Sequence, residues 1–508
     1  MLASNHKRIL RNTGMLYIRM LLAMGVGLYT SRVVLDVLGV QDFGTYHVVA
    51  GFVALLGFMQ GAMTTATQRY FAYDLGLNSG DNLNGLFNTS LQVHGLLAVC
   101  VVLVAETAGY WFVSTQLTIP EDRLATALTA YHLSVAAFAI SVMTVPLTAM
   151  LMANERMGLF ALMSMADILL KLFAVLILPF LAYDKMSMYA ALLLFVSIAT
   201  FCGYFVINSA IFPAARFRWY LDKKNFRRML GFTAWNMWGN LAAALSEHGN
   251  NVLLNIFFGP AINAGRSIAT QANGALNQFV ANVQAAVNPQ IVKLYASGEL
   301  AQMHEMVLRA AKYNFFILLA LAMPVLLNAD ELLKLWLVNV PPYAPTFLRL
   351  TIIFSLINSI SGPLMTSAQA TGHIRLYHSV VGGILLFNVP INYLLLSNGL
   401  PAETVLLVTI LLGLIALAAR LFIIAPLINL PASLFLSRVV GRISVVALVL
   451  GFLTELPDLR VNDSLFTLLV SLMTATAVTI FVIWFLGLDR SERRNVVGIF
   501  RSLKARVA

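Results

Sequence analysis

Apolar segments long enough to cross a membrane recur from one end of the chain to the other. A helix needs about 20 mostly apolar residues to span the hydrocarbon layer of a bilayer. The chain contains fourteen such segments, and the connections between them are too short to hold a soluble domain. They lie at residues 13–38, 44–68, 86–113, 125–152, 157–182, 187–212, 230–257, 266–291, 311–338, 345–369, 378–398, 402–427, 439–456 and 464–487. We therefore expect an all-α polytopic membrane protein of about 14 transmembrane helices.

The composition excludes the common soluble classes. Only 11% of the 508 residues are charged, whereas 59% are hydrophobic, and soluble domains usually carry about 25% charged residues. So little charge cannot cover several soluble domains, which excludes a soluble enzyme or a soluble nucleic-acid-binding protein. Cys100 and Cys202 both lie in apolar runs and indicate neither a disulfide framework nor a cysteine metal site. The sequence has no Walker loop and no His-Glu-x-x-His motif, so we expect no cofactor or metal.

The distribution of basic residues predicts the orientation in the membrane. With the N-terminus in the cytoplasm, 23 of the 33 Lys and Arg residues, including Arg309 and Lys312, fall on the cytoplasmic side and 6 on the outer side. Cytoplasmic loops are enriched in Lys and Arg, so we expect both termini in the cytoplasm. The excess of basic residues then faces the anionic cytoplasmic leaflet. Membrane lipids are therefore expected partners, and nucleic acid is not.

Two stretches of the chain resemble each other. Residues 32–39 (Arg-Val-Val-Leu-Asp-Val-Leu-Gly) and 43–46 resemble residues 251–259 (Asn-Val-Leu-Leu-Asn-Ile-Phe-Phe-Gly) and 263–266. Each stretch ends one apolar segment and leads into a more polar one, so segments one and two match segments seven and eight. This pattern predicts two repeated six-helix lobes in the same orientation. We expect lobes at 1–213 and 230–428, a basic cytoplasmic linker at 214–229, and two additional helices with a basic tail at 429–508.

These stretches also carry a family resemblance. Residues 31–39, residues 249–260 (Gly-Asn-Asn-Val-Leu-Leu-Asn-Ile-Phe-Phe-Gly-Pro) and residues 286–296 resemble the Wzx-like O-antigen and capsule flippases. These flippases are polysaccharide transporters of the multidrug/oligosaccharidyl-lipid/polysaccharide (MOP) superfamily. The resemblance implies two lobes around a central cavity in the bacterial inner membrane. It also implies transfer of undecaprenyl-pyrophosphate-linked oligosaccharide to the periplasmic leaflet by alternating access, with a polysaccharide polymerase as a possible assembly partner.

Three arginines are candidates for binding the pyrophosphate. Arginine stays charged and offers several planar donors, and ionisable residues inside a membrane are costly and usually functional. Arg19 and Arg32 lie in the first segment and Arg266 begins the eighth. A structural contact remains open for Arg19. For Arg32, a local ion pair with Asp36 is about as plausible as contact with substrate.

Four further ionisable residues are candidates for ion coupling. Asp167 and Lys171 stand at i and i+4 in the fifth segment, where a self-neutralised helical pair is the favoured interpretation and ion coupling the other. Glu247 and His248 lie in the seventh segment. A carboxylate at this depth is expected to be protonated or paired across helices.

Amide side chains are concentrated in segments seven and eight. Amides both donate and accept hydrogen bonds, which suits sugar hydroxyls, although they also hold membrane helices together. The substrate-binding candidates among them are Asn240, Asn251, Gln271, Asn277 and Gln284. We favour the substrate-binding interpretation because one face of the eighth segment carries so many amides.

Two other transporter functions remain open. An ion-coupled multidrug antiporter of the same superfamily would favour carboxylates in the N-terminal lobe, whereas the first segment offers two arginines. A lipid II flippase shares the helix count, but its characteristic segments are not recognised in this sequence. The outer connections are too short to build a catalytic site, so a transporter is expected rather than a membrane enzyme.

Overall fold

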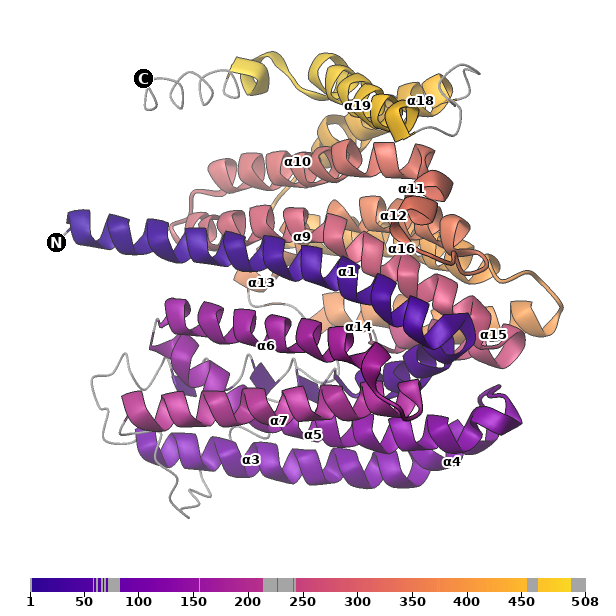
Figure 1. Ribbon diagram of the computed structural model, residues 1–508. Helices are drawn as coiled ribbons and strands as arrows, with labels where there is room; N and C mark the ends of the chain where they lie inside the picture. Colours follow the sequence, from indigo (N-terminus) through magenta and orange to yellow (C-terminus); the bar gives the residue numbers. More distant parts are fainter. Residues whose placement is uncertain are drawn as a thin grey trace. The chain divides into compact units, whose positions relative to one another are not determined.

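The computed structural model describes residues 2–57, 59–60, 63–64, 67, 70–71, 83–154, 156–212, 226, 241, 244–371, 373, 375–454 and 465–494. Within these residues every regular element is a helix (Figure 1), as the sequence predicts. The chain divides into two compact units, which we describe separately. Unit 1 comprises Met1–Gln271, Leu337–Ala344 and Leu386–Val405, and unit 2 comprises Ala272–Trp336, Pro345–Leu385 and Leu406–Ala508.

Eleven helices in the described part of the chain are long and apolar enough to cross a membrane. They coincide with eleven of the fourteen predicted segments, which confirms a polytopic membrane protein. The other three are the polar segments. Segments 44–68 and 230–257 lie partly outside the described residues. Segment 266–291 lies in α9 (Pro260–Ala296), whose many amides lower its mean hydropathy below that of a membrane-spanning helix. The total of fourteen and the two lobes stay predictions, and the linker 214–229 lies outside the described residues except at Phe226.

Unit 1 contains a bundle of long helices from the first half of the chain. Helices α1, α5, α6 and α7 pack against one another, and α3 packs against α5. Their bounds are α1 Leu2–Leu55, α3 Leu83–Val104, η2 Ala105–Gly109, α4 Tyr110–Thr115, η3 Glu121–Arg123, α5 Leu124–Ala153, α6 Met157–Ile177, η4 Leu178–Phe180 and α7 Lys185–Ile211. The side chains of Phe71, Phe87, Leu147 and Met150 form a fully buried core beneath α3 and α5.

The two repeated stretches share a backbone feature. Gly39 interrupts α1 with φ of 74°, and Gly259 precedes α9 (Pro260–Ala296) with φ of 81°. Both values lie in the left-handed region that only glycine adopts at little cost. The equivalent glycines of the repeat therefore end their helices in the same way. The two repeated stretches also lie close together at Gly44. A Cβ atom on Gly44 would collide with the Pro260 carbonyl and crowd the Ala264 nitrogen.

Proline marks two of the helix breaks later in the chain. α12 (Ala344–Ser359) is followed by α13 (Ser361–Thr371), and α14 (Arg375–Leu386) by α15 (Asn388–Ser397). Pro363 and Pro390 each stand third in the new helix. Proline fits there because the amide hydrogens of the first turn have no helical partner.

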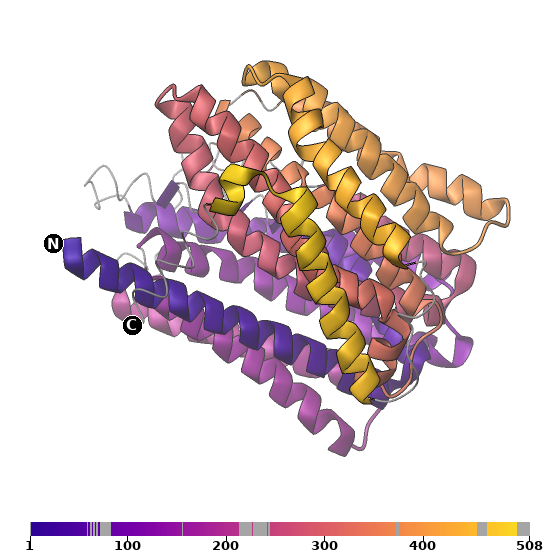
Figure 2. The same cartoon turned by 90° about the horizontal axis from the view of Figure 1, so that it is seen from above.

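Unit 2 is built around α10, which packs against α13, α18 and α19. Figures 1 and 2 show α19 lying along α10 within this unit. The remaining bounds are α10 Leu300–Leu327, α11 Ala329–Trp336, α16 Thr404–Leu427, α17 Ala432–Phe435, η6 Leu436–Val440, α18 Gly441–Thr454, α19 Leu465–Val482 and η8 Ile483–Gly487.

Several predicted helix starts differ from the structure, and those of α9 and α10 bear on buried residues. α9 begins at Pro260 rather than at residue 266, and α10 begins at Leu300 rather than at residue 311. The apolar search missed these turns because they carry polar residues that continue a helix without adding membrane-spanning hydrophobicity. Lys312, which the charge count assigns to the cytoplasmic side, lies in the middle of α10 and is only 4% exposed.

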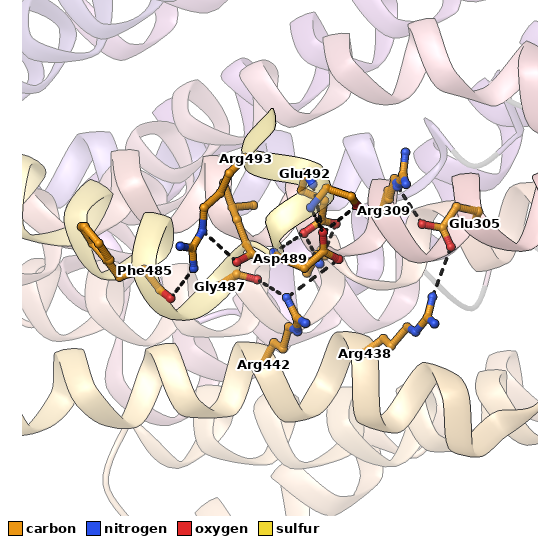
Figure 3. Close-up of polar contacts among 12 residues, drawn as sticks. Glu305, Arg309, Arg438, Arg442, Phe485, Gly487, Asp489, Glu492 and Arg493 are labelled. Atoms are coloured by element: carbon orange, nitrogen blue, oxygen red, sulfur yellow. Dashed lines mark hydrogen bonds and ion pairs between the residues drawn. The ribbon is translucent and has the colours of Figure 1, made fainter. Parts of the chain in front are cut away.

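A charged junction fixes the end of η8 to α10. It consists of Lys312, Arg442, Asp489, Glu492 and Arg493. Lys312 Nζ lies 2.6 Å from Glu492 Oε1, and Arg493 Nη2 donates to the Phe485 carbonyl at 2.7 Å (Figure 3). Asp489 accepts the backbone amide of Glu492 at 2.9 Å, and Glu492 Oε2 accepts the amide of Asp489 at 2.9 Å. These reciprocal bonds form a capping box at the start of the short helix that follows.

Candidate functional site

A polar pocket of about 340 Å³ lies inside unit 1. Its walls come from α5, α6 and α7 and from two residues of the polar second segment. The lining residues are Gln60, Thr64, Ser141, Thr144, Val145, Thr148, Ser164, Asp167, Ile168, Lys171, Ser197, Thr200 and Tyr204. Most of them carry a hydroxyl group, although the helices are otherwise strongly apolar.

The predicted Asp167–Lys171 pair lies in this pocket. Lys171 Nζ is 2.7 Å from Asp167 Oδ2, and Thr200 of α7 donates to Asp167 Oδ1 at 3.2 Å. The pair is therefore self-neutralised along α6, which is the alternative to ion coupling that the sequence left open. Asp167 is ten residues from either end of α6, or about 15 Å at 1.5 Å per residue. This places the pair near the middle of the membrane-spanning helix.

A second polar group joins Glu247 and His248 to Arg266. Arg266 lies within α9 rather than at its start, and it is only 7% exposed. The charge of Glu247 acts on both Arg266 and His248. The Glu247 side chain is itself exposed in the structure, so its pairing across helices stays a prediction.

The other two arginine candidates are not placed in a common site. The side chains of Arg32 and Asp36 are exposed, and no ion pair links these two described residues. The local pair expected as an alternative for Arg32 is therefore not formed. Arg19 belongs to α1, but its side chain lies outside the described part of the structure, and so does the whole of Asn240.

The amides of α9 differ in what they contact. Asn277 Nδ2 donates to Ser355 Oγ of α12 at 3.1 Å, and Asn273 Nδ2 donates to the same oxygen at 2.9 Å. These two amides join α9 to α12, as the helix-packing interpretation expects. The Gln284 side chain occupies the space beside Gly362, and the Gln271 side chain lies against Gly27.

Asn251 has a different environment from these amides. Its Oδ1 is buried and has no hydrogen-bond partner among the described residues. For all five amide candidates, contact with substrate stays a prediction.

The sequence interpretation missed a buried amide network in unit 1. Asn388 Nδ2 donates to Ser246 Oγ at 2.8 Å, and Asn392 Nδ2 contacts Asn388 Oδ1 at 2.6 Å and Asn250 Oδ1 at 3.1 Å. Asn388 and Asn392 are both fully buried. Their i, i+4 spacing within the apolar run 384–396 was the available signal.

Arg420, near the end of α16, is another buried arginine. It is 7% exposed, and its Nη1 donates to Ser361 Oγ at 2.7 Å and Asn358 Oδ1 at 3.3 Å. The guanidinium therefore binds the α12–α13 break within unit 2. Its role there is structural, since it supplies donors to polar groups at an interrupted helix.

The fold is that of a multi-pass helical membrane protein with polar groups between its helices. The structure resembles the lipid II flippase MurJ in an inward closed conformation, with a TM-score of 0.70 and 14% identity over 92% of this chain and 97% of that chain. It also resembles the inward-facing conformation of a multidrug resistance MATE family transporter of the MOP superfamily, with a TM-score of 0.61 and 13% identity over 81% of this chain and 98% of that chain.

A third similar structure is a MOP superfamily transporter from Pyrococcus furiosus, with a TM-score of 0.56 and 15% identity over 84% of this chain and 96% of that chain. No family model and no curated protein matches the sequence. At such low identities the structural likeness shows the fold alone. The chain therefore has the fold of MOP-superfamily transporters, and its substrate has to be argued from its own residues.

Proposed function

We propose that the protein is a flippase that moves an undecaprenyl-pyrophosphate-linked oligosaccharide from the cytoplasmic to the periplasmic leaflet of a bacterial inner membrane. The observation that carries this proposal is the polar pocket inside unit 1, where hydroxyl groups surround the Asp167–Lys171 ion pair. The fold is similar to that of a lipid II flippase over 92% of the chain and to that of a drug transporter over 81%, so it is compatible with this substrate but does not select it. The oligosaccharide crosses by alternating access of the two lobes, and it is a precursor of surface polysaccharide.

The charge of the pocket in unit 1 favours a lipid-linked saccharide over a cationic drug. A cationic drug requires an uncompensated carboxylate or an aromatic cage in its site. Here the Asp167 carboxylate is neutralised by Lys171 at 2.7 Å. The pocket therefore offers hydroxyl groups and no net negative charge.

The remaining sequence candidates receive roles within this proposal. Arg19, Arg32 and Arg266 bind the pyrophosphate, because guanidinium groups pair with phosphate oxygens in several planar geometries. Asn240, Asn251, Gln271, Asn277 and Gln284 contact the sugars. Glu247 and His248 couple transport to an ion gradient. A polysaccharide polymerase is the expected assembly partner.

A genetic experiment tests the proposal in cells. Deletion of the gene should abolish surface glycan, and undecaprenyl-pyrophosphate-linked oligosaccharide should accumulate on the cytoplasmic leaflet. The wild-type gene should restore the glycan. Arg19→Ala should not restore it although the protein reaches the membrane, and Arg19→Lys, which keeps the charge, should restore part of it.

The same experiment separates the alternatives. Accumulation of lipid II with cell lysis would support a lipid II flippase instead. Unchanged surface glycan together with greater sensitivity to cationic drugs would support a multidrug antiporter. Normal glycan in the Arg19→Ala strain would remove Arg19 from the mechanism.

A further inference from the structure

The pocket in unit 1 is unusually polar for its depth. Its lining includes Asp167, halfway along α6, where polar groups are costly unless they serve a purpose. The Asp167–Lys171 ion pair accounts for two of its polar residues. The hydroxyl groups of α5 and α7 need a separate explanation.

Most of these hydroxyls have already donated their hydrogen. Their acceptors are backbone carbonyls of the same helix, at 2.7 to 3.0 Å, for Thr64, Ser141, Thr144, Thr148 and Ser197. Thr200 donates to Asp167 instead. A hydroxyl has one hydrogen and two lone pairs, so these oxygens remain as acceptors along the pocket wall.

The balance of donors and acceptors selects the chemistry of the ligand. A wall of acceptors suits a ligand that brings several hydrogen-bond donors. Phosphate and pyrophosphate bring only acceptors and negative charge, so they do not fit. An organic cation gains little from a pocket in which Lys171 neutralises the carboxylate. Sugar hydroxyls do fit, because each donates to one oxygen and can accept from another donor such as the Lys171 ammonium, which has three hydrogens.

The size of the pocket limits how much saccharide it holds. A volume of about 340 Å³ is near the lower end of small-molecule sites, which span roughly 300–1,000 Å³. One sugar ring fits this space, and a whole oligosaccharide does not. Val145, Ile168 and Tyr204 add apolar surface for the face of the ring.

We infer that this pocket, inside the helices of unit 1, is a subsite that binds one sugar ring of the lipid-linked head group through the acceptor oxygens of α5 and α7. This inference rests on the proposed function. It assigns sugar recognition to Thr144, Thr148, Ser197 and the Asp167–Lys171 pair, and it leaves the pyrophosphate to the arginines. The pocket therefore selects glycosylated lipid over lipid that carries the pyrophosphate alone.

The test compares two lipids in vesicles that contain the purified full-length protein. One lipid is undecaprenyl pyrophosphate and the other is undecaprenyl-pyrophosphoryl N-acetylglucosamine, each with ³²P in the pyrophosphate. A soluble pyrophosphatase outside the vesicles releases label only from the outer leaflet, so the release rate reports flipping. The measured quantity is the ratio of the glycosylated rate to the unglycosylated rate.

The variant Thr144→Val/Thr148→Val removes two pocket oxygens and keeps the shape of both side chains. The matched control is Thr129→Val, because Thr129 lies on α5 with the same bond to its own helix, at 3.0 Å to the Ala125 carbonyl, but is exposed outside the pocket. Losing two hydrogen bonds should lower the ratio about tenfold in the double variant. The control should keep the wild-type ratio.

Each outcome has a definite meaning. A wild-type protein that flips neither lipid contradicts the proposed function itself. A double variant that flips both lipids with the wild-type ratio, or that slows both equally, overturns the sugar subsite and leaves the proposed function standing. The equal slowing would indicate a pocket that binds only water or a coupling ion.

Discussion

At the scale of single residues, the charges of this protein divide into exposed pairs and pairs removed from solvent. Among the ion pairs of the described residues, the Lys312–Glu492 pair is the most deeply buried, with side chains 5% and 2% exposed. The Arg309–Glu305 pair on the same α10 is 35% and 40% exposed. Breaking the two pairs should therefore change the free energy of unfolding by different amounts, although the N–O distance is short in both.

Breaking the buried pair from one side should destabilise the protein strongly. Lys312→Met leaves the Glu492 carboxylate without its cation, and Glu492→Gln leaves the Lys312 ammonium alone, at a cost of about 3–5 kcal/mol each. The double variant Lys312→Met/Glu492→Gln should recover much of this loss, because no charge is left buried. Unfolding by SDS in mixed micelles measures these free energies.

Arg309→Ala is the control for the buried pair. It removes an exposed partner and should cost less than about 1 kcal/mol. If the two single variants at the junction cost no more than Arg309→Ala, the pair is not buried in the folded protein.

Asp489 contributes a pH-dependent share of stability. Burial opposes its ionisation, but hydrogen bonds from the Glu492 amide and Ser491, together with Lys312 and Arg442, more than offset this and lower the pKa of Asp489 to about 2. A lowered pKa stabilises the folded state above the unfolded value of about 4, and this stabilisation is lost as the pH falls from about 4 towards 2.

Asp489→Ala should therefore lower the melting temperature at pH 7 by removing both the charge and the cap, which is worth about 1 kcal/mol. The difference from the wild type should shrink as the pH falls below about 4. Asp489→Asn keeps a good cap and isolates the contribution of the charge. A difference of the same size at pH 3 and pH 7 would show that the charge makes no contribution.

At the scale of elements, the sequence predicted which segments are helices more reliably than where they begin. Eleven predicted segments coincide with apolar helices because twenty apolar residues in a row have few other solutions. The starts of α9 and α10 were predicted late because polar turns extend these helices past the apolar core.

The pocket could be predicted only in part for a related reason. The i, i+4 spacing marked Asp167 and Lys171, but serines and threonines in helices usually satisfy themselves on their own backbone. Only the packing of α5, α6 and α7 shows that their hydroxyls converge. The amides Asn388 and Asn392 carry a similar lesson, since their partners lie about 140 residues earlier in the chain.

The glycine that divides the first helix gives a prediction at this scale. Gly39 has φ of 74° and open space around it, so Gly39→Ala should cost about 1 kcal/mol or more through backbone strain alone. Gly25→Ala is the control, because Gly25 lies inside α1 with open space and without a positive φ. It should be neutral or stabilising by up to about 1 kcal/mol. Thermal melting in detergent distinguishes the two, and equal effects would contradict a left-handed break at residue 39.

At the scale of the whole molecule, the sequence predicted an all-α polytopic membrane protein, and the fold confirms this coarse description. The fold is shared by proteins with different substrates, so it cannot choose among them. The identity of the substrate therefore has to be inferred from the polar side chains that each protein places inside its helices.

The predicted orientation can be tested with single cysteines in a background that lacks Cys100 and Cys202. Gln116 and Ser297 are both exposed, in connections predicted to lie on opposite sides. In intact spheroplasts, a membrane-impermeant maleimide should label Gln116→Cys at once and Ser297→Cys only after permeabilisation. The reverse pattern would place both termini outside.

The most direct measurement of the central claim is transport by the purified protein in vesicles. Undecaprenyl-pyrophosphate-linked oligosaccharide, lipid II and a cationic dye are supplied separately, and crossing is followed with and without an ion gradient. The account predicts that the linked oligosaccharide crosses much faster than in protein-free vesicles, while the dye does not. Dye movement driven by the ion gradient, with no movement of either glycolipid, would contradict it.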